Sequence, residues 1–201
     1  MLRLAARSFA TQGYTATTMR SIADQAGIEA ASIYYHFASK EELVDVVMEH
    51  GADSIVQHIK EHLDALPPAA NAEDRFKAAL VGQMSALIKF GDYALAHNRL
   101  LTQLPDKVRE RQVKRRERHQ RMWTTVFDDL RAEGYLREDI DIALSRVFVL
   151  GFINSVQTWF DPKKGSLEKI ADQFVTMFFE GAAPAVKPRR SGRKKELAAS
   201  S

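Results

Sequence analysis

The residues best suited to chemistry lie in the segment His58-Ile59-Lys60-Glu61-His62, which has the H-x-x-E-H spacing of a group of zinc peptidases. On a helix the two histidines share one face, so that a metal ion could bridge them. No third ligand can be identified, however, and the segment falls within a long helix expected after residue 40. We therefore interpret it as a pair of exposed polar histidines and expect no metal site.

No other segment has the residues of a catalytic centre. The chain has no Gly-rich phosphate loop, no G-x-S-x-G turn and no cysteine, which removes disulfides, thiolate zinc ligands and cysteine nucleophiles. We expect neither an enzyme nor a cofactor. The lack of cysteine agrees with a reducing cytoplasm, and no signal peptide or membrane-spanning apolar run is visible. A cytoplasmic location is therefore predicted.

Two short helices, one capped by Thr17 or Thr18 and ending at Ala26, the other over residues 29–37, flank a turn at Gly27-Ile28. This arrangement indicates a helix-turn-helix, whose second helix enters the DNA major groove. The spacing provides a small core consisting of Ile22, Ala26, Ile28, Ile33 and Phe37. The outward side chains would be Ser32, Tyr34, Tyr35 and His36. A purely structural aromatic core is the alternative interpretation of Tyr34-Tyr35-His36-Phe37.

Ordered motifs run through residues 1–47 without a gap: Phe9, Gly13-Tyr14, Thr17-Thr18-Met19-Arg20-Ser21-Ile22-Ala23, Ala26-Gly27-Ile28, Ser32-Ile33-Tyr34-Tyr35-His36-Phe37 and Ser39-Lys40-Glu41-Glu42-Leu43. With this spacing the region closely resembles the TetR family of repressors. The resemblance implies that Thr18 and Arg20 approach the DNA backbone or an outer base. It further implies that Ala30, Ala31, Ser32 and Tyr34 face bases, and that Tyr35, His36 and Lys40 contact phosphates.

The resemblance has one departure that concerns charge. Family members usually carry a basic segment before the first helix, whereas this sequence begins within that helix, so either the start codon is misassigned or those phosphate contacts are missing. The first 46 residues hold four basic and five acidic side chains. We therefore expect a modest DNA affinity that depends strongly on salt.

Helical periodicity covers most of the chain and no strand alternation is sustained, which predicts an all-α fold. A capping box at Ser39 and Glu42 opens a long helix that Pro67-Pro68 ends. The expected helices cover residues 2–12, 18–26, 29–37, 40–66, 73–89, 92–102, 106–133, 141–159 and 167–180. We expect three parts: a three-helix DNA-binding domain over 1–47, a helical ligand-binding and dimerisation bundle over 48–183, and a disordered basic tail over 184–201.

The basic tail also accounts for the positive net charge. Without residues 187–201, the formal charge changes from +3 to −2, because 23 basic and 25 acidic residues remain. Net charge is therefore no evidence for DNA binding by the folded part. The tail itself could add sequence-independent DNA affinity, and a merely solubilising tail is the alternative.

The helix over 106–133 carries a stripe that changes from apolar to cationic along its length. Residues 107–121 hold eight Lys or Arg against two Glu. A cavity with an apolar end and a basic end suits an amphipathic anion such as a fatty-acyl or steroid-derived coenzyme A thioester. The candidate ligand-binding residues are Gln112, Arg115, Arg116, His119, Trp123, Phe127, Phe148, Phe152 and Trp159. A solvated charged face is the alternative.

Scattered motifs in the second half include Leu104-Pro105, Met122-Trp123, Gly134-Tyr135-Leu136-Arg137, Gly151-Phe152-Ile153-Asn154 and Trp159-Phe160 followed by Pro162. They resemble TetR-family regulators of fatty-acid and steroid catabolism, which implies an acyl-CoA effector. Two alternatives stay open: a repressor that responds to a hydrophobic drug or aromatic compound, and a helical ligand-binding protein or enzyme that does not bind DNA.

The last two expected helices are apolar on several sides, and such helices are buried on several sides. A two-fold interface of four helices between two copies is the simplest solution. The candidate dimerisation residues are Phe148, Val156, Phe174, Met177 and Phe178. A monomer with a deep core is the alternative.

Overall fold

The computed structural model describes residues 1–100 and 102–180, without the side chains of Asn98 and of residues 113–116. Within these residues the chain forms helices and no strand, which confirms the all-α fold. The helices are α1 (Leu2–Ala16), α2 (Met19–Ala26), α3 (Ala30–His36), α4 (Lys40–Asp64), α5 (Ala72–Lys89), α6 (Gly91–Leu100), α7 (Asp106–Ala132), α8 (Ile142–Trp159) and α9 (Leu167–Glu180). The predicted basic tail lies outside the described residues.

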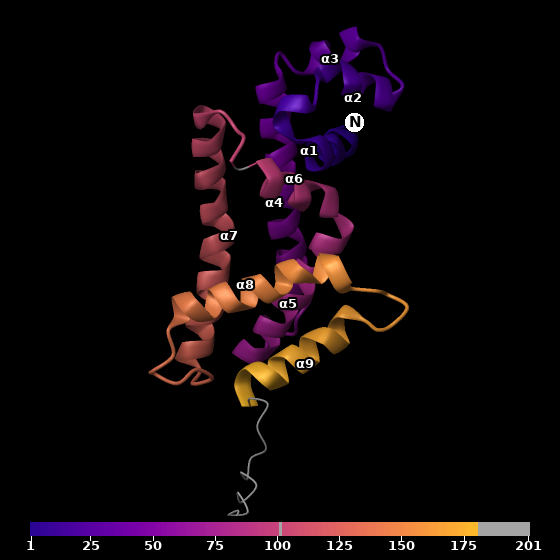
Figure 1. Ribbon diagram of the computed structural model, residues 1–201. Coiled ribbons are helices and arrows are strands. Elements are labelled where there is room, and N and C mark those ends of the chain that lie inside the picture. Colours follow the sequence, from indigo (N-terminus) through magenta and orange to yellow (C-terminus); the bar gives the residue numbers. More distant parts are fainter. Residues whose placement is uncertain (101, 181–201) are drawn as a thin grey trace, which may run out of the picture.

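Helices α1 to α3 form a small head at one end of the molecule, and α4 leads from it into the body (Figure 1). Thr18 caps α2: its hydroxyl accepts from the amide of Ser21 at 3.0 Å. Gly27 ends α2 in the left-handed conformation, with φ +65°, which a residue without Cβ adopts most readily. Thr17 is buried instead, and its hydroxyl donates to the Gly13 carbonyl.

Two sequence predictions about the head need correction. Ile28, which was assigned to the core, is 36% exposed, because it follows the left-handed turn on the outer side of the bend. The second hydrogen bond of the predicted capping box, from the Ser39 amide to the Glu42 carboxylate, is replaced by one from a neighbouring amide. Ser39 accepts from the Glu42 amide at 3.1 Å, but the Glu42 carboxylate accepts from the amide of Ala38 at 2.7 Å.

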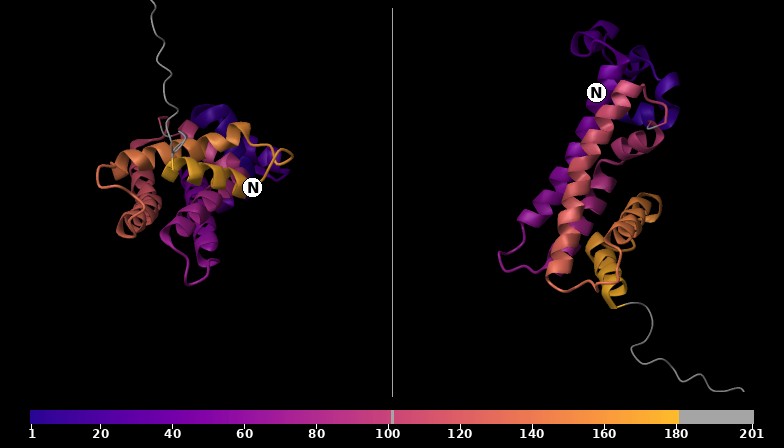
Figure 2. Two further views of the ribbon diagram at one scale, coloured as in Figure 1. Left: turned by 90° about the horizontal axis from the view of Figure 1, so that it is seen from below. Right: turned by 90° about the vertical axis from the view of Figure 1, so that its left-hand side faces the viewer.

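The body is arranged around α5, which packs against α4, α6, α7, α8 and α9. Helix α7 lies alongside α4, while α8 and α9 cross the end of the body away from the head (Figure 2). Gly82 permits the close approach of α4 and α5, because a Cβ at this position would lie 2.9 Å from the Ile59 Cα. None of the described helices has the length and apolar content needed to cross a membrane.

The buried apolar residues form two clusters. The body core surrounds α5 and contains Phe76, Trp123 and Phe127. The head core contains residues of α1 to α4, but Tyr93 of α6 and Val108 of α7 belong to it as well. Packing of the head therefore continues across the domain boundary predicted at residue 47.

Replacement of Gly82 by alanine is expected to lower the free energy of unfolding by about 1–3 kcal/mol, because the new methyl group would press on the α4 backbone. Urea denaturation followed by circular dichroism would measure this change. Gly165→Ala is the control: it meets open space and is expected to change stability by less than about 0.5 kcal/mol. Equal stability of both variants would contradict the close approach.

Candidate DNA-reading surface and ligand cavity

Helix α3 presents its polar and aromatic residues to solvent. Ile33 points inward and is fully buried, whereas Tyr34 is 56% and Tyr35 87% exposed. Ala31, Ser32 and His36 are also exposed, and Ala30 is half-buried. The exposed aromatic rings are therefore not an internal core. Their side chains are available for contact with another molecule.

At the start of α2, Thr18 and Arg20 are exposed on the head as well. No hydrogen bond or ion pair of the Arg20 side chain is found in the described part of the chain. The predicted DNA contacts of α2 and α3 thus remain accessible. Their role at DNA stays a prediction.

Lys40 differs from the other predicted DNA contacts because it has internal partners. Its ammonium group donates to the carbonyl oxygens of Tyr14 at 2.9 Å and Thr17 at 3.1 Å, and it lies 4.3 Å from the centre of the Tyr14 ring. The Tyr14 hydroxyl donates to Glu41 at 2.8 Å. Burial, and then this bond to Glu41, raise the pKa of Tyr14. Lys40 therefore ties the end of α1 to the start of α4.

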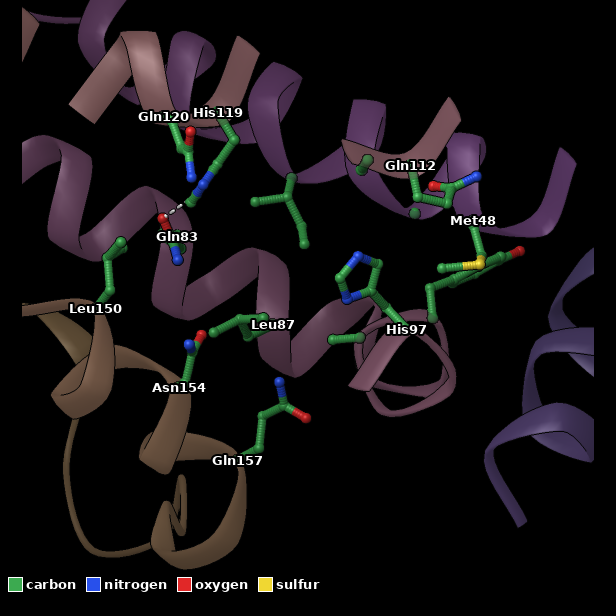
Figure 3. Close-up of a pocket in the computed structure, with 15 residues that line it drawn as sticks. Met48, Gln83, Leu87, His97, Gln112, His119, Gln120, Leu150, Asn154 and Gln157 are labelled. Atoms are coloured by element: carbon green, nitrogen blue, oxygen red, sulfur yellow. Dashed lines mark hydrogen bonds between the residues drawn. The ribbon is translucent and has the colours of Figure 1, made fainter. Parts of the chain in front are cut away.

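A cavity of about 210 Å³ lies in the body where five helices meet. Figure 3 shows side chains that converge on it from α4, α5, α6, α7 and α8. Its wall combines aliphatic groups with amides and imidazoles. The lining residues are Met48, Gly51, Ala52, Ile55, Gln83, Leu87, Tyr93, Ala94, His97, Gln112, His119, Gln120, Leu150, Asn154 and Gln157.

Gln83 is the most strongly held polar group on this wall. Its side-chain oxygen accepts from Trp123 Nε1 at 2.5 Å and is 2.8 Å from His119 Nε2. An indole nitrogen can only donate, so the atom beside it must be the amide oxygen. The same oxygen cannot donate, and His119 must therefore carry its proton on Nε2.

Some basic residues of α7 form ion pairs with acidic residues of α4. Arg111 pairs with Asp45 at 2.8 Å, and Gln112 donates to the other oxygen of the same carboxylate at 2.8 Å. Arg118 pairs with Asp53 at 3.1 Å. Arg111 and Arg118 therefore join α7 to α4, although 47% and 59% of their side chains remain exposed to solvent. The side chains of Arg115 and Arg116 lie outside the described residues.

The other predicted ligand residues lie in different parts of the structure: at the cavity, in the core and on the surface. Gln112 and His119 line the cavity. Trp123 and Phe127 are fully buried in the body core behind it, because their rings pack against Phe76. Phe148 is 64% exposed on α8.

A second hollow lies between α8 and α9, and Phe152 and Trp159 line it together with Phe174 and Met177. These two predicted ligand residues are thus not brought together with Gln112 and His119. The hollow belongs to the face that carries the exposed apolar side chains.

This apolar face occupies α8 and α9. Phe148 and Met177 of the predicted dimerisation set are exposed, whereas Phe174 and Phe178 are half-buried. Val156 is fully buried within the protomer, because it points to α5 rather than outward. The exposed members of the face are Leu144, Val147, Phe148, Trp159 and Met177. Exposed large apolar side chains on α8 and α9 agree with the dimerisation surface predicted there, which stays a prediction.

The histidine pair on α4 is half-buried rather than exposed as predicted, and both rings have partners. The His58 ring lies 3.1 Å from the Glu61 carboxylate, and His62 donates to the His58 carbonyl at 2.8 Å. In the described part of the chain no group of three His, Cys, Asp or Glu residues is placed to hold a metal ion.

Comparison with known proteins decides the class of this molecule. Residues 1–47 match the family described as "Bacterial regulatory proteins, tetR family", and residues 69–182 match "Tetracyclin repressor-like, C-terminal domain". The chain belongs to the TetR family. It is therefore a transcription regulator and not an enzyme, and members of this family bind operator DNA, dimerise and respond to small molecules.

Individual relatives include regulators of steroid and lipid metabolism. The chain is 30% identical to the HTH-type transcriptional repressor KstR2 of Mycobacterium tuberculosis over 184 residues, 90% of each chain. The structure of that ketosteroid transcriptional regulator has a TM-score of 0.74 with 28% identity, and covers 90% of this chain and 91% of its own. The fatty acid metabolism regulator of Bacillus subtilis is 24% identical over 86% of this chain and 88% of its own.

One solved structure, that of AibR in complex with isovaleryl coenzyme A and operator DNA, has a TM-score of 0.70 and 25% identity. The likeness covers 89% of this chain and 95% of AibR. A protein of similar fold has thus been solved with both isovaleryl coenzyme A and operator DNA.

Sequence reasoning missed several residues of the cavity. Gln83 was not among the candidate ligand residues, although a lone amide between the apolar residues Leu80, Met84 and Leu87 at helical spacing is a signal. Asp45 was not considered as the partner of Arg111 and Gln112. Tyr93, His97 and Gln157 reach the cavity from α6 and α8 and belong to none of the motifs, whereas Asn154 belongs to the motif over 151–154 but had no role assigned.

Replacement of Lys40 by methionine is expected to lower the free energy of unfolding by about 1–3 kcal/mol, because the carbonyls of Tyr14 and Thr17 lose a charged donor. Thermal and urea denaturation would measure the loss. Arg20→Met removes a cation from the exposed surface of the same head and is expected to change stability by less than about 0.5 kcal/mol. If Lys40→Met weakened DNA binding at unchanged stability, the phosphate contact would be its main role.

Proposed function

We propose that this TetR-family protein is a dimeric repressor in the cytoplasm whose binding to a palindromic operator is controlled by an acyl-CoA thioester from lipid or steroid breakdown. The observation that carries the proposal is the cavity between α4 and α8, in a chain whose relatives include a ketosteroid regulator, a fatty-acid regulator and an acyl-CoA complex. An acyl group would be the ligand of this cavity.

On the DNA side, α3 is the helix that would enter the major groove. Its exposed Ser32 and Tyr34, with Ala30 and Ala31, would meet base edges and thymine methyl groups. Thr18, Arg20, Tyr35 and His36 would lie beside phosphates, with Lys40 at the edge of this set. In a dimer joined through α8 and α9, two such heads would read two half-sites.

The size of the cavity limits how much of a thioester it encloses. Its volume of about 210 Å³ lies below the range of roughly 300–1,000 Å³ that is typical of pockets enclosing a drug-sized ligand. The acyl end would therefore occupy the cavity, and the nucleotide would lie outside it. Gln120 and Asn154 line the cavity and are exposed, so the exit for the nucleotide would lie on the side of α7 and α8.

The cavity and the head are connected by shared residues. Met48 of α4 and Tyr93 of α6 line the cavity and also belong to the head core. Asp45 on α4 holds Gln112, a lining residue, by a hydrogen bond. A ligand that binds more tightly when α6 or α7 is displaced would therefore also favour a different position of the heads. Regulation requires such a difference in ligand affinity between two states of the protein.

A second effector class, a neutral aromatic or drug-like compound, is favoured by one observation: the cavity lining in the described residues contains no Lys, Arg, Asp or Glu. The two classes differ in charge. An acyl-CoA response would depend on ionic strength, because the nucleotide carries phosphates, whereas a neutral ligand would bind equally at low and high salt.

The test is fluorescence anisotropy of the protein on the duplex upstream of its own gene, with a panel of acyl-CoA thioesters of increasing chain length. We expect binding that at least one thioester reverses, while free coenzyme A does not. DNA binding that no thioester changes would support the repressor function but exclude an acyl-CoA as its effector. Absence of sequence-preferring binding would contradict the DNA-reading surface.

Tyr35→Phe is expected to weaken operator binding roughly tenfold, because a hydroxyl donor to phosphate is removed. Since this side chain is 87% exposed, the melting temperature should stay unchanged. Anisotropy titrations and thermal melts of the same samples would check both parts. Tyr135→Phe, far from the head in the C-terminal half, is the control and should bind the operator normally. Unchanged affinity of Tyr35→Phe would exclude Tyr35 from the interface.

A further inference from the structure

Gln83 has a fixed orientation that determines what it offers to a ligand. The side chain is 3% exposed and lines the cavity from α5. Its oxygen accepts from Trp123 and from His119, so rotation of the amide by 180° would place its NH₂ group against the indole N–H of Trp123, which can only donate. The amide therefore cannot exchange its oxygen and nitrogen without the loss of the bond to Trp123.

The nitrogen of this amide faces the cavity. No hydrogen bond of Gln83 Nε2 is found within the described residues, yet no fully buried side-chain polar atom in that part of the chain lacks a partner. The nitrogen must therefore reach open space. Figure 3 shows it on the side of the amide opposite the bond to His119, toward Leu87 and Asn154. The cavity thus contains a pair of N–H donors whose direction is fixed.

Gln112 is fixed in the opposite sense. Its nitrogen donates to Asp45, a carboxylate that only accepts, so its oxygen is the atom left for the cavity. Gln83 lies at the level of His119, and seven residues of α7 separate His119 from Gln112, which corresponds to about 10 Å along the helix axis. The cavity therefore has a donor and an acceptor at two separate levels.

We propose that Gln83 recognises a carbonyl oxygen of the effector, and that Gln112 accepts from an N–H or O–H group about 10 Å away. This inference rests on the proposed function, because it specifies the effector of the same cavity. The ligand class is a carbonyl compound with a second, donating polar group. In an acyl-CoA the carbonyl is either that of the thioester or a further oxo group on the acyl chain.

A ligand without a carbonyl would be rejected for a physical reason. When a methylene group covers Gln83, it removes water from the two N–H donors and replaces none of the lost hydrogen bonds. An unpaired buried donor weakens binding roughly tenfold to a hundredfold. Gln83 is therefore a specificity-determining residue, and aliphatic packing alone would not select the effector.

The test compares three thioester analogues of one chain length: octyl-CoA, a thioether without a carbonyl, octanoyl-CoA and 3-oxooctanoyl-CoA. Binding is measured on the full chain through Trp123 fluorescence in the Trp159→Phe background, which leaves Trp123 as the single tryptophan. If Gln83 binds the thioester carbonyl, octanoyl-CoA and 3-oxooctanoyl-CoA bind alike and octyl-CoA at least tenfold more weakly. If it binds a chain carbonyl, 3-oxooctanoyl-CoA is at least tenfold tighter than the other two.

Gln83→Glu is the decisive variant, because a carboxylate still accepts from Trp123 and His119 but presents an oxygen where the N–H pair was. It should remove the preference for the carbonyl compound and weaken its binding at least tenfold. Gln57→Glu, which adds the same charge at an exposed amide of α4 outside the cavity lining, is the matched control and should keep the preference. Equal binding of all three analogues to the parent protein would overturn the inference without any variant.

A pair of neutral compounds distinguishes failure of the acyl-CoA proposal from failure of the role of Gln83. The pair is 2-octanone and 2-methyl-1-octene, and in the alkene a CH₂ group replaces the carbonyl oxygen of the ketone. If no CoA compound binds but the ketone is preferred over the alkene, and Gln83→Glu removes that preference, the acyl-CoA proposal fails and the role of Gln83 stands. If ketone and alkene bind alike, or neither binds, the role of Gln83 is overturned.

Discussion

The head of this protein depends on helices that it shares with the ligand cavity. Its core is completed by Tyr93 of α6 and Val108 of α7, and α4 runs from the head into the cavity wall. A short three-helix unit has little apolar surface of its own, so it needs such support to be stable. The consequence is that α4 and α6 cannot move at the cavity without a change of packing at the head.

The buried amide of Gln83 illustrates how a polar group is retained in an apolar helix interface. Burial of an amide is unfavourable unless its hydrogen bonds are made, and Trp123 and His119 satisfy the oxygen. The nitrogen is satisfied only by water or a ligand in the cavity. Leucine at this position would leave the buried Trp123 Nε1 without an acceptor, so the oxygen of Gln83 has a structural role and its nitrogen is the part available to a ligand.

The sequence predicted the local features of the fold well, because they depend on neighbouring residues. Thr18, Gly27 and Ser39 act as the caps their positions indicate, and the inward Ile33 separates the two sides of α3. Ile28 was misplaced because its exposure depends on the direction of the chain after the left-handed turn. That direction is not contained in an apolar pattern.

Contacts between distant helices could not be predicted in the same way. The basic residues of α7 and the acidic residues of α4 are 65 or more positions apart, and only the packing of the two helices shows that Arg111 and Arg118 meet Asp45 and Asp53. The aromatic residues of α7 present a related problem. Trp123 and Phe127 have the same spacing whether they line a cavity or fill a core. Their packing against Phe76 of another helix places them in the core, and the sequence of α7 alone does not contain that contact.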